Sequence, residues 1–198
     1  MRKKSHISLG KYLVEAAEIR ELKNHRKAFL VGCILPDCKP SFLTKRHEIQ
    51  ETYDLVKDQI RRLSEDYNMM RFSKLSYWRK SGEVLHYIAD YFTYPHNEIY
   101  GGTLRDHCKY ENYLKHYMRY YLLSGRVRGH QGMPEQFSCV EDIYEYVERE
   151  HTRYLAGNHG LGNDTFYIAR VCLQVVAGMY QLCCQRMVQE YRVLALAA

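Results

Sequence analysis

Apolar residues recur along this chain at the three- and four-residue spacing of an α-helix. Between Arg46 and Tyr67 they form one stripe at successive steps of four, three, four and three residues, made of Ile49, Tyr53, Val56, Ile60 and Leu63. Residues at this spacing lie on one face of a helix, and that face packs against the rest of the protein. The pattern therefore predicts a helix over residues 46–67.

The same spacing predicts five further helices, over residues 5–22, 72–92, 103–121, 140–154 and 164–182. Ser5 and Asp164 are suitable N-caps for the first and the last of these helices, because their side chains can accept a hydrogen bond from a free backbone N–H. Pro36 and Pro40 predict a loop after the first helix, and no segment has the two-residue period of a β-strand. We expect an all-α fold with a single multi-helix domain over residues 1–198.

The composition is that of a folded protein with a mild excess of positive charge. Of the 198 residues, 46% are hydrophobic and 26% are charged, which excludes wholesale disorder. The net charge of +6 favours anionic partners but does not by itself indicate nucleic acid. No apolar run is long enough to predict a transmembrane segment.

Cysteine use and the N-terminal segment bear on the compartment. The chain has seven cysteines and no CxxC pair, so neither a thiolate zinc site nor a secreted disulfide framework is indicated. The segment from Ser5 to Ala17 is interrupted by Lys11 and Glu15, so it is not the apolar core of an export signal. We expect a cytoplasmic protein.

Three histidines are followed by an acidic residue four positions later, in the pairs His47 with Glu51, His86 with Asp90, and His107 with Glu111. About one such pair is expected by chance at this acidic content. Residues four apart share a face of a helix, so each pair can bind one metal ion. The excess of pairs suggests a metal site.

The segment after the second pair supplies another ligand. Pro95 ends the helix that carries His86 and Asp90, so that His96 can turn back toward the same place. The third pair, His107 and Glu111, lies on a later helical stripe.

That stripe also holds Leu114 and Met118, so it is expected to be buried. An imidazole and a carboxylate on a buried face must be neutralised or coordinated, because an isolated buried charge is very unfavourable. A lone inward histidine is most often a hydrogen-bonded core residue, but a metal ion explains the whole group better. The candidate ligands are thus His86, Asp90, His96, His107 and Glu111.

Taken in order, these residues resemble the zinc-dependent phospholipase C family, which shares a helical fold with the zinc-dependent single-strand nucleases. The family pattern is a histidine, an aspartate four residues later and a histidine six residues after that, followed downstream by a histidine with an acid four residues later. Glu111 favours the phospholipase branch, because the nucleases carry aspartate at that position. The N-terminal half follows the family order too, with His6, Asp37 and His47.

The resemblance implies a bundle of the phospholipase C and nuclease type with three metal positions. The first ion would be held by Asp37, His47, His86 and Asp90, and the second by His96, His107 and Glu111. The third would be held by His6, by a bridging Asp90, and by the amine and carbonyl of Met1. Family members usually expose an N-terminal tryptophan, so the third position depends here on a free Met1 amine.

Zinc is the expected metal, with two or three ions, and iron or manganese also suit nitrogen and oxygen ligands. The resemblance implies that Asp37 orients the attacking water or acts as its base. A zinc-bound hydroxide would then attack phosphorus, which makes the chain a hydrolase of phosphodiesters. We expect a phosphoester small molecule or lipid as substrate, with peripheral membrane contact, and nucleic acid as a less favoured partner.

Two alternatives stay open. One is a zinc-dependent single-strand nuclease or nucleotide phosphatase, which would release mononucleotides from single-stranded nucleic acid. The other is a catalytically silent, metal-stabilised helical binding module, which would contain metal but hydrolyse no phosphoester.

Overall fold

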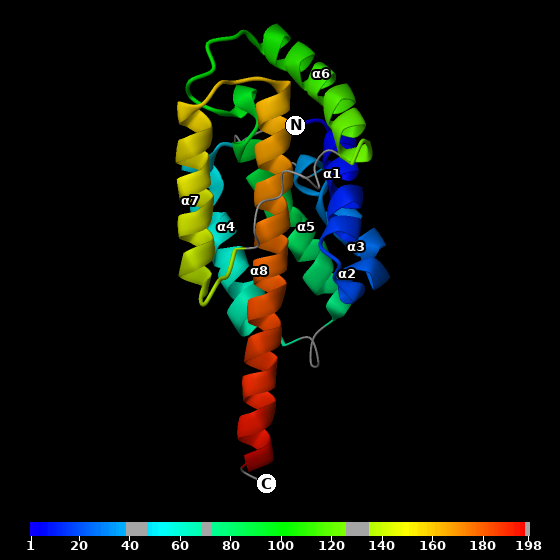
Figure 1. The fold of residues 1–198 in the computed structure, drawn as a ribbon, viewed down its shortest axis with the longest axis vertical. Helices are drawn as coiled ribbons and strands as arrows, with labels where there is room; N and C mark the ends of the chain where they lie inside the picture. The colour runs from blue at the N-terminus through cyan, green and yellow to red at the C-terminus, as the bar shows by residue number, and fades with distance from the viewer. Residues whose placement is uncertain (39–46, 69–72, 126–134, 197–198) are drawn as a thin grey trace.

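A computed structural model describes residues 1–38, 47–68, 73–125 and 135–196. Every regular element within those ranges is helical, so the predicted all-α fold is confirmed (Figure 1). The α-helices are α1 (Lys3–Ala16), α2 (Arg20–Asn24), α3 (Arg26–Gly32), α4 (Ile49–Arg61), α5 (Lys74–Tyr91), α6 (Leu104–Leu123), α7 (Val140–Ala156) and α8 (Leu161–Leu196). The shorter helical segments are η1 (Pro36–Cys38), η3 (Arg62–Asp66) and η4 (Tyr94–His96).

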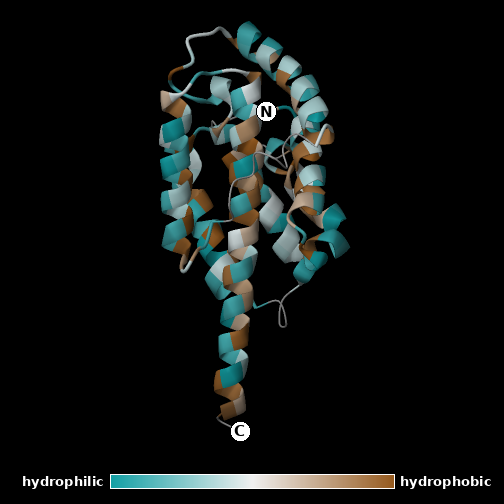
Figure 2. Ribbon diagram, viewed as in Figure 1, coloured by the Kyte–Doolittle hydropathy of each residue, from teal (hydrophilic) through white to brown (hydrophobic). Residues whose placement is uncertain are grey.

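Two long helices, α5 and α8, form the centre of the bundle. Helices α4 and α7 lie on one side of this pair and α1, α2 and α3 on the other, while α6 runs obliquely across the end that holds the N-terminus (Figure 1). Apolar and hydrophilic residues share the outer helices (Figure 2). On α4, the stripe predicted from the sequence is buried at Tyr53, Val56 and Ile60 and continues to Leu63 in η3. The buried apolar side chains of all these helices join in one core.

The first predicted helix, over residues 5–22, is in fact two helices. The chain breaks after α1 because Glu18 adopts a positive φ of 55°. A residue in this left-handed region cannot continue a right-handed helix. The predicted starts of the second and third helices, Arg46 and Phe72, lie outside the described residues.

The last helix differs from the prediction at both ends. It begins at Leu161 rather than at Asp164, which is not an N-cap but a completely buried residue of the first turn. It also continues past Leu182 to Leu196, and this last part extends beyond the bundle (Figure 1). By length and composition alone, α8 could cross a membrane, but 67% of its most apolar window is buried inside the protein, where it packs as a core helix.

Two glycines allow α3 and α5 to approach very closely. A Cβ atom on Gly82 would collide with the Phe29 carbonyl, and one on Gly32 would collide with the Arg79 carbonyl. Because neither glycine has a side chain, the C-terminal end of α3 lies directly against α5. This contact brings the backbone carbonyl of Cys33 to the face of α5 that carries the candidate site.

Candidate metal centre

Helix α5 supplies the two residues around which the site is built. His86 and Asp90 lie one turn apart and are completely buried, because α5 runs through the centre of the bundle. Nδ1 of His86 donates a hydrogen bond to the Cys33 carbonyl at 2.9 Å. The other nitrogen, Nε2, therefore carries a lone pair and faces the site. Burial holds the pKa of His86 well below its usual value, so the ring is neutral, as a metal ligand must be.

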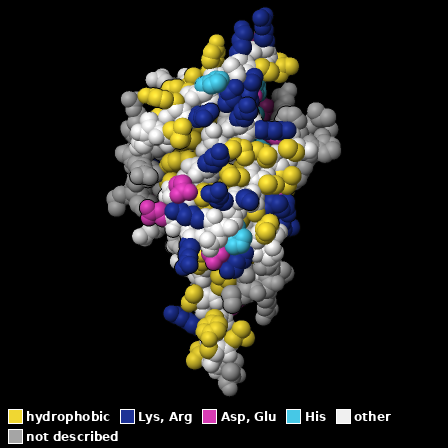
Figure 3. Space-filling model, turned by 90° about the vertical axis from the view of Figure 1, so that its right-hand side faces the viewer, with side chains coloured by type: hydrophobic (Ala, Val, Ile, Leu, Met, Phe, Trp, Pro, Cys, Tyr) yellow, Lys and Arg dark blue, Asp and Glu magenta, His cyan; other side chains and the backbone are white. Residues whose placement is uncertain are grey.

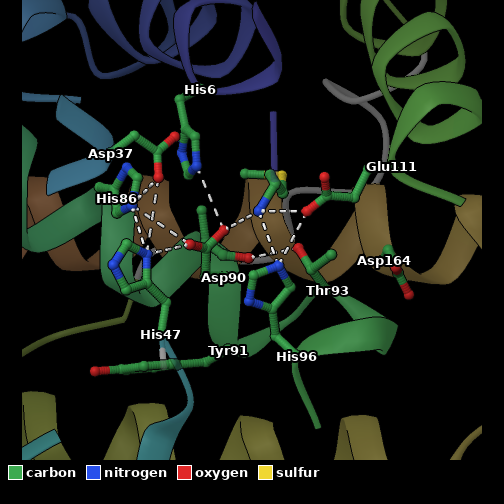
Figure 4. Close-up of polar contacts among 12 residues, drawn as sticks. His6, Asp37, His47, His86, Asp90, Tyr91, Thr93, His96, Glu111 and Asp164 are labelled. Carbon is green, nitrogen blue, oxygen red and sulfur yellow. Dashed lines mark hydrogen bonds and ion pairs between the residues drawn. The ribbon is translucent and has the colours of Figure 1, made fainter. Parts of the chain in front are cut away.

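Four donor atoms from three segments meet beside α5. Nε2 of His86 lies 3.0 Å from His47 Nδ1, 3.4 Å from Asp90 Oδ2 and 3.6 Å from Asp37 Oδ1. Nδ1 of His47 lies 3.0 Å from Asp90 Oδ2 and 4.0 Å from Asp37 Oδ1. Donor atoms bound tetrahedrally to one zinc ion at about 2.1 Å lie about 3.4 Å apart. The spacing of this first group therefore suits a single ion (Figure 4).

A second group forms where η4 meets α6. Pro95 lies in η4, which turns the chain so that His96 points back toward α6. Nε2 of His96 is 3.2 Å from Glu111 Oε1, and Nε2 of His107 is 3.1 Å from the same oxygen. A capping box between Thr103 and Asp106 fixes the start of α6 just before His107. All three ligand residues are half-buried, so this group stays open on one side.

Met1 and His6 meet the other oxygen of Asp90. The Met1 amine is 2.6 Å from Asp90 Oδ1, and His6 Nε2 is 3.4 Å from the same oxygen. The amine is also 3.0 Å from His96 Nε2 and 3.3 Å from Glu111 Oε1. One carboxylate thus faces the first group through Oδ2 and the N-terminus through Oδ1, which is the arrangement that a bridging ligand needs.

All eight side chains predicted as ligands fall into three clusters of potential metal ligands, and within the described ranges these clusters contain no other residue. The clusters are His6, Asp37 and His86; His47, His86 and Asp90; and His96, His107 and Glu111. Besides its contact with Asp90, His6 belongs to the cluster of Asp37 and His86. The His6 ring stacks on the His86 ring, with 3.9 Å between the ring centroids.

The chemistry of the donors fits divalent cations. Three carboxylates, Asp37, Asp90 and Glu111, share this region. Among the described residues the buried Met1 amine is the one Lys, Arg or N-terminal cation that pairs with them, so the negative charge exceeds the positive charge. Uncompensated buried charge is very unfavourable, and metal ions would remove the imbalance. Both ring nitrogens of His6 are buried and find no hydrogen-bond partner among the described residues, as expected for a ligand. The nitrogen and oxygen donors are those that zinc prefers outside thiolate sites.

The carboxylates differ in how readily they hold a proton. Burial raises the pKa of Asp90, but the Met1 amine and His96 outweigh burial and hold it well below its usual value. Hydrogen bonds from His107 and His96 likewise outweigh burial and lower the pKa of Glu111. Burial and the neighbouring Asp90 instead raise the pKa of Asp37. Asp37 is therefore the carboxylate in the site best suited to accept a proton.

A buried carboxylate outside the three clusters, that of Asp164, connects both segments of the second group and is not the N-cap that the sequence predicts. Oδ2 of Asp164 accepts hydrogen bonds from the Tyr94 backbone N–H at 3.0 Å and from the Tyr110 hydroxyl at 2.8 Å, and Oδ1 accepts one from the Tyr154 hydroxyl at 2.9 Å. Tyr94 starts the turn that carries His96, and Tyr110 precedes Glu111. Asp164 therefore positions η4 against α6.

The site opens into a cleft of about 1150 Å³. Ligands of all three groups line it, and so do the cationic residues Arg2, Lys3, Lys4 and Lys115. A cleft of this volume is large enough for a small phosphoester or the headgroup of a lipid.

His151, for which the sequence pattern predicts no role, supports the turn beside His96. Its Nε2 donates to Asn97 Oδ1 at 2.9 Å, and Asn97 in turn donates to the backbone carbonyls of Tyr91 and Thr93. Burial lowers the pKa of His151 to about 4. The structure needs this ring to be neutral.

We expect His151 to make the fold sensitive to acid. The unfolded chain binds a proton below about pH 6.5, whereas the folded chain does so only below about pH 4, so folding loses stability as the pH falls through this range. Replacing His151 with glutamine should reduce the fall in the free energy of unfolding between pH 7 and pH 5 by about 2 kcal/mol. Urea unfolding at the two pH values measures this, with His25→Gln as the control. An unchanged pH dependence would contradict the assignment.

The comparisons with known proteins gave one match. A family model described as zinc dependent phospholipase C matches residues 5–160, which is more than half of the chain and includes every predicted ligand except Met1. The comparison with curated proteins and the comparison with solved structures gave no match.

Proposed function

Because the chain belongs to the zinc-dependent phospholipase C family, we propose that it hydrolyses phosphodiesters in the cleft beside Asp90. The observation that carries the proposal is the position of Asp90. Its two oxygens face two separate sets of ligands, so two ions would share this carboxylate. Family membership and the ligand clusters support a metal-dependent hydrolase, and the choice of a phosphodiester is our inference from them.

The residues that would hold the ions are the eight clustered side chains and the Met1 amine. Zinc bound in such a site lowers the pKa of a coordinated water to about 7 and offsets the negative charge of a phosphate group. The tautomer of His86 is fixed by Cys33, and Asp164 holds the two segments of the second group, so the protein prepares the ligand geometry in advance.

Asp37 is the residue that we assign to proton transfer. Its carboxylate lines the cleft beside His47 and His86, and its raised pKa favours taking a proton from the attacking water. Lys3 and Lys4 line the same cleft and would bind the phosphate oxygens of the substrate.

The proposal is tested by metal analysis together with a substrate panel. Protein with a free Met1 amine is loaded with zinc, freed of excess metal, and assayed with monomeric dihexanoylphosphatidylcholine, bis(p-nitrophenyl) phosphate and a single-stranded oligonucleotide. We expect turnover of the phospholipid. His86→Ala and Glu111→Ala should each lose metal and at least about 100-fold in turnover, with Glu111→Ala emptying chiefly the second group.

The matched control for these variants is His25→Ala, since His25 lies at the end of α2 and contacts none of the ligands. Fully loaded protein that hydrolyses no phosphoester would refute the hydrolase and favour a binding module. Release of mononucleotides without turnover of phospholipid would instead favour the nuclease.

A further inference from the structure

A second groove lies between α1 and α6, beside the metal cleft. It has a volume of about 1050 Å³, and its apolar lining comes from Ile7, Tyr12, Ala16, Leu122 and Leu123. Five cationic residues lie around it: Lys3, Lys4, Lys11, Lys115 and Arg119. The groove therefore combines an apolar floor with a positively charged rim.

The positive charge of this rim is largely uncompensated. None of the five cationic side chains forms an ion pair within the described part of the chain, and Lys115 only donates to the amide oxygen of Asn112. Glu15 is the one acidic residue that lines the groove, and it pairs with Lys23 at 3.5 Å. Figure 3 shows this side of the molecule, with Lys and Arg side chains spread among apolar ones and few acidic groups. The charge is complementary to a polyanionic surface.

Helix α6 adds apolar side chains that point to solvent. Of its twenty residues only Leu114 and Met118 are buried. Leu104 and Leu123 are 79% and 77% exposed, and Tyr113 and Tyr120 are each 63% exposed. A helix with Lys and Arg beside exposed leucines and aromatic rings is typical of helices that lie in the headgroup region of a bilayer. Single-stranded nucleic acid would use the cations and the tyrosines but has no use for the leucines.

The groove and the metal cleft share one rim. Lys3, Lys4 and Lys115 line both of them, and Leu104 lines the cleft at the other end of α6 from Leu123. A surface that contacts the groove would therefore also cover the mouth of the metal cleft.

We propose that the face formed by α1 and α6 docks on a bilayer that contains anionic phospholipid, with the apolar groove against the acyl region and the metal cleft at the level of the headgroups. The docking itself needs no metal. The functional role of this docking rests on the proposed function, because docking would present lipid phosphodiesters to the metal site.

The test is binding to vesicles, measured by flotation. We expect the protein to bind vesicles made of equal amounts of phosphatidylcholine and phosphatidylglycerol, to bind vesicles of phosphatidylcholine alone much less, and to be released by high salt. The variant Lys11→Glu with Arg119→Glu should weaken binding about tenfold or more. Neither residue lines the metal cleft.

The matched control is Lys57→Glu with Arg62→Glu, which changes the net charge equally but lies on α4 and η3, on the other side of the bundle (Figure 1). The proposal would be overturned if the protein did not bind vesicles, or bound neutral vesicles equally well. It would also be overturned if the control variant lost as much vesicle binding, or if the protein bound an oligonucleotide but not vesicles. Turnover of monomeric dihexanoylphosphatidylcholine should be unchanged in Lys11→Glu/Arg119→Glu. Glu111→Ala should bind vesicles normally without turnover, so failure of docking and failure of catalysis are distinguishable.

Discussion

Replacing Asp90 with asparagine is expected to remove the metal from the first group and from the N-terminal position together, and to lower turnover at least about 100-fold. Oδ2 of Asp90 lies next to His47 and His86, and Oδ1 lies next to the Met1 amine and His6. An asparagine keeps one oxygen and puts an amide donor in place of the other. That donor would face either the imidazole nitrogens or the amine, and the amide oxygen that remains is uncharged. Both sets of ligands therefore lose the negative charge that they share, and one of them also loses a ligand atom.

The same substitution should reduce stabilisation by zinc, because only the second group of ligands would keep its ion. A ligand that binds only the folded state at 100 times its Kd adds about 2.7 kcal/mol to the free energy of unfolding. We expect urea unfolding to show a gain of at least this size for the wild-type protein when zinc is added, and a smaller gain for Asp90→Asn. Asp54→Asn is the matched control, because Asp54 is an exposed acid on α4. A variant that still binds zinc with unchanged stoichiometry would show that Asp90 is not a shared ligand.

The local part of the site follows from the sequence alone. The pairs His86 with Asp90 and His107 with Glu111 each lie on one helix, so their spacing fixes which side chains share a face. Pro95 likewise marks the turn that directs His96 back to α6. These features depend on a few consecutive residues and on helix geometry.

The rest of the site depends on packing between distant segments. Met1 and Asp90 are 89 positions apart, and no periodicity indicates that the start of α1 meets the middle of α5. His6 and Asp37 enter the prediction only through the family resemblance, because their spacing carries no helical signal. The helical spacing of His47 and Glu51 does indicate a pair, but His47 lies before the start of α4, and Glu51 belongs to none of the three clusters. The structure brings these residues together around α5, partly through the contact between α3 and α5 that Gly32 and Gly82 permit.

The N-cap role predicted for Asp164 is wrong, although the sequence also contains a pattern that indicates its burial. It lies four residues before Ile168, which lies three residues before Val171, on a stripe that the structure buries. An acid on such a stripe needs hydrogen-bond donors, by the same reasoning that made Glu111 a candidate ligand. Its position before an apolar run also suits an N-cap, and only the tertiary structure distinguishes the two roles by supplying Tyr94, Tyr110 and Tyr154.

Extending the chain before Met1 is expected to have an effect nearly as large as that of Asp90→Asn. Burial lowers the pKa of the Met1 amine, but Asp90 and Glu111 outweigh burial and raise it above its usual value. The amine is completely buried and touches ligands of two groups. An amide bond at this nitrogen removes its lone pair, and an added residue has to enter the space that the ligands occupy.

We therefore expect a short peptide fused before Met1 to lower zinc content by one ion and turnover by about 10- to 100-fold. The decisive control is the same fusion with a protease site placed so that cleavage regenerates the Met1 amine. Metal content and turnover should return after cleavage and reloading, which a general folding defect or an altered surface would not explain. If the uncleaved fusion contains as much zinc as the cleaved protein and hydrolyses phospholipid as fast, the amine is not a ligand, and Asp90 bridges through His6 alone.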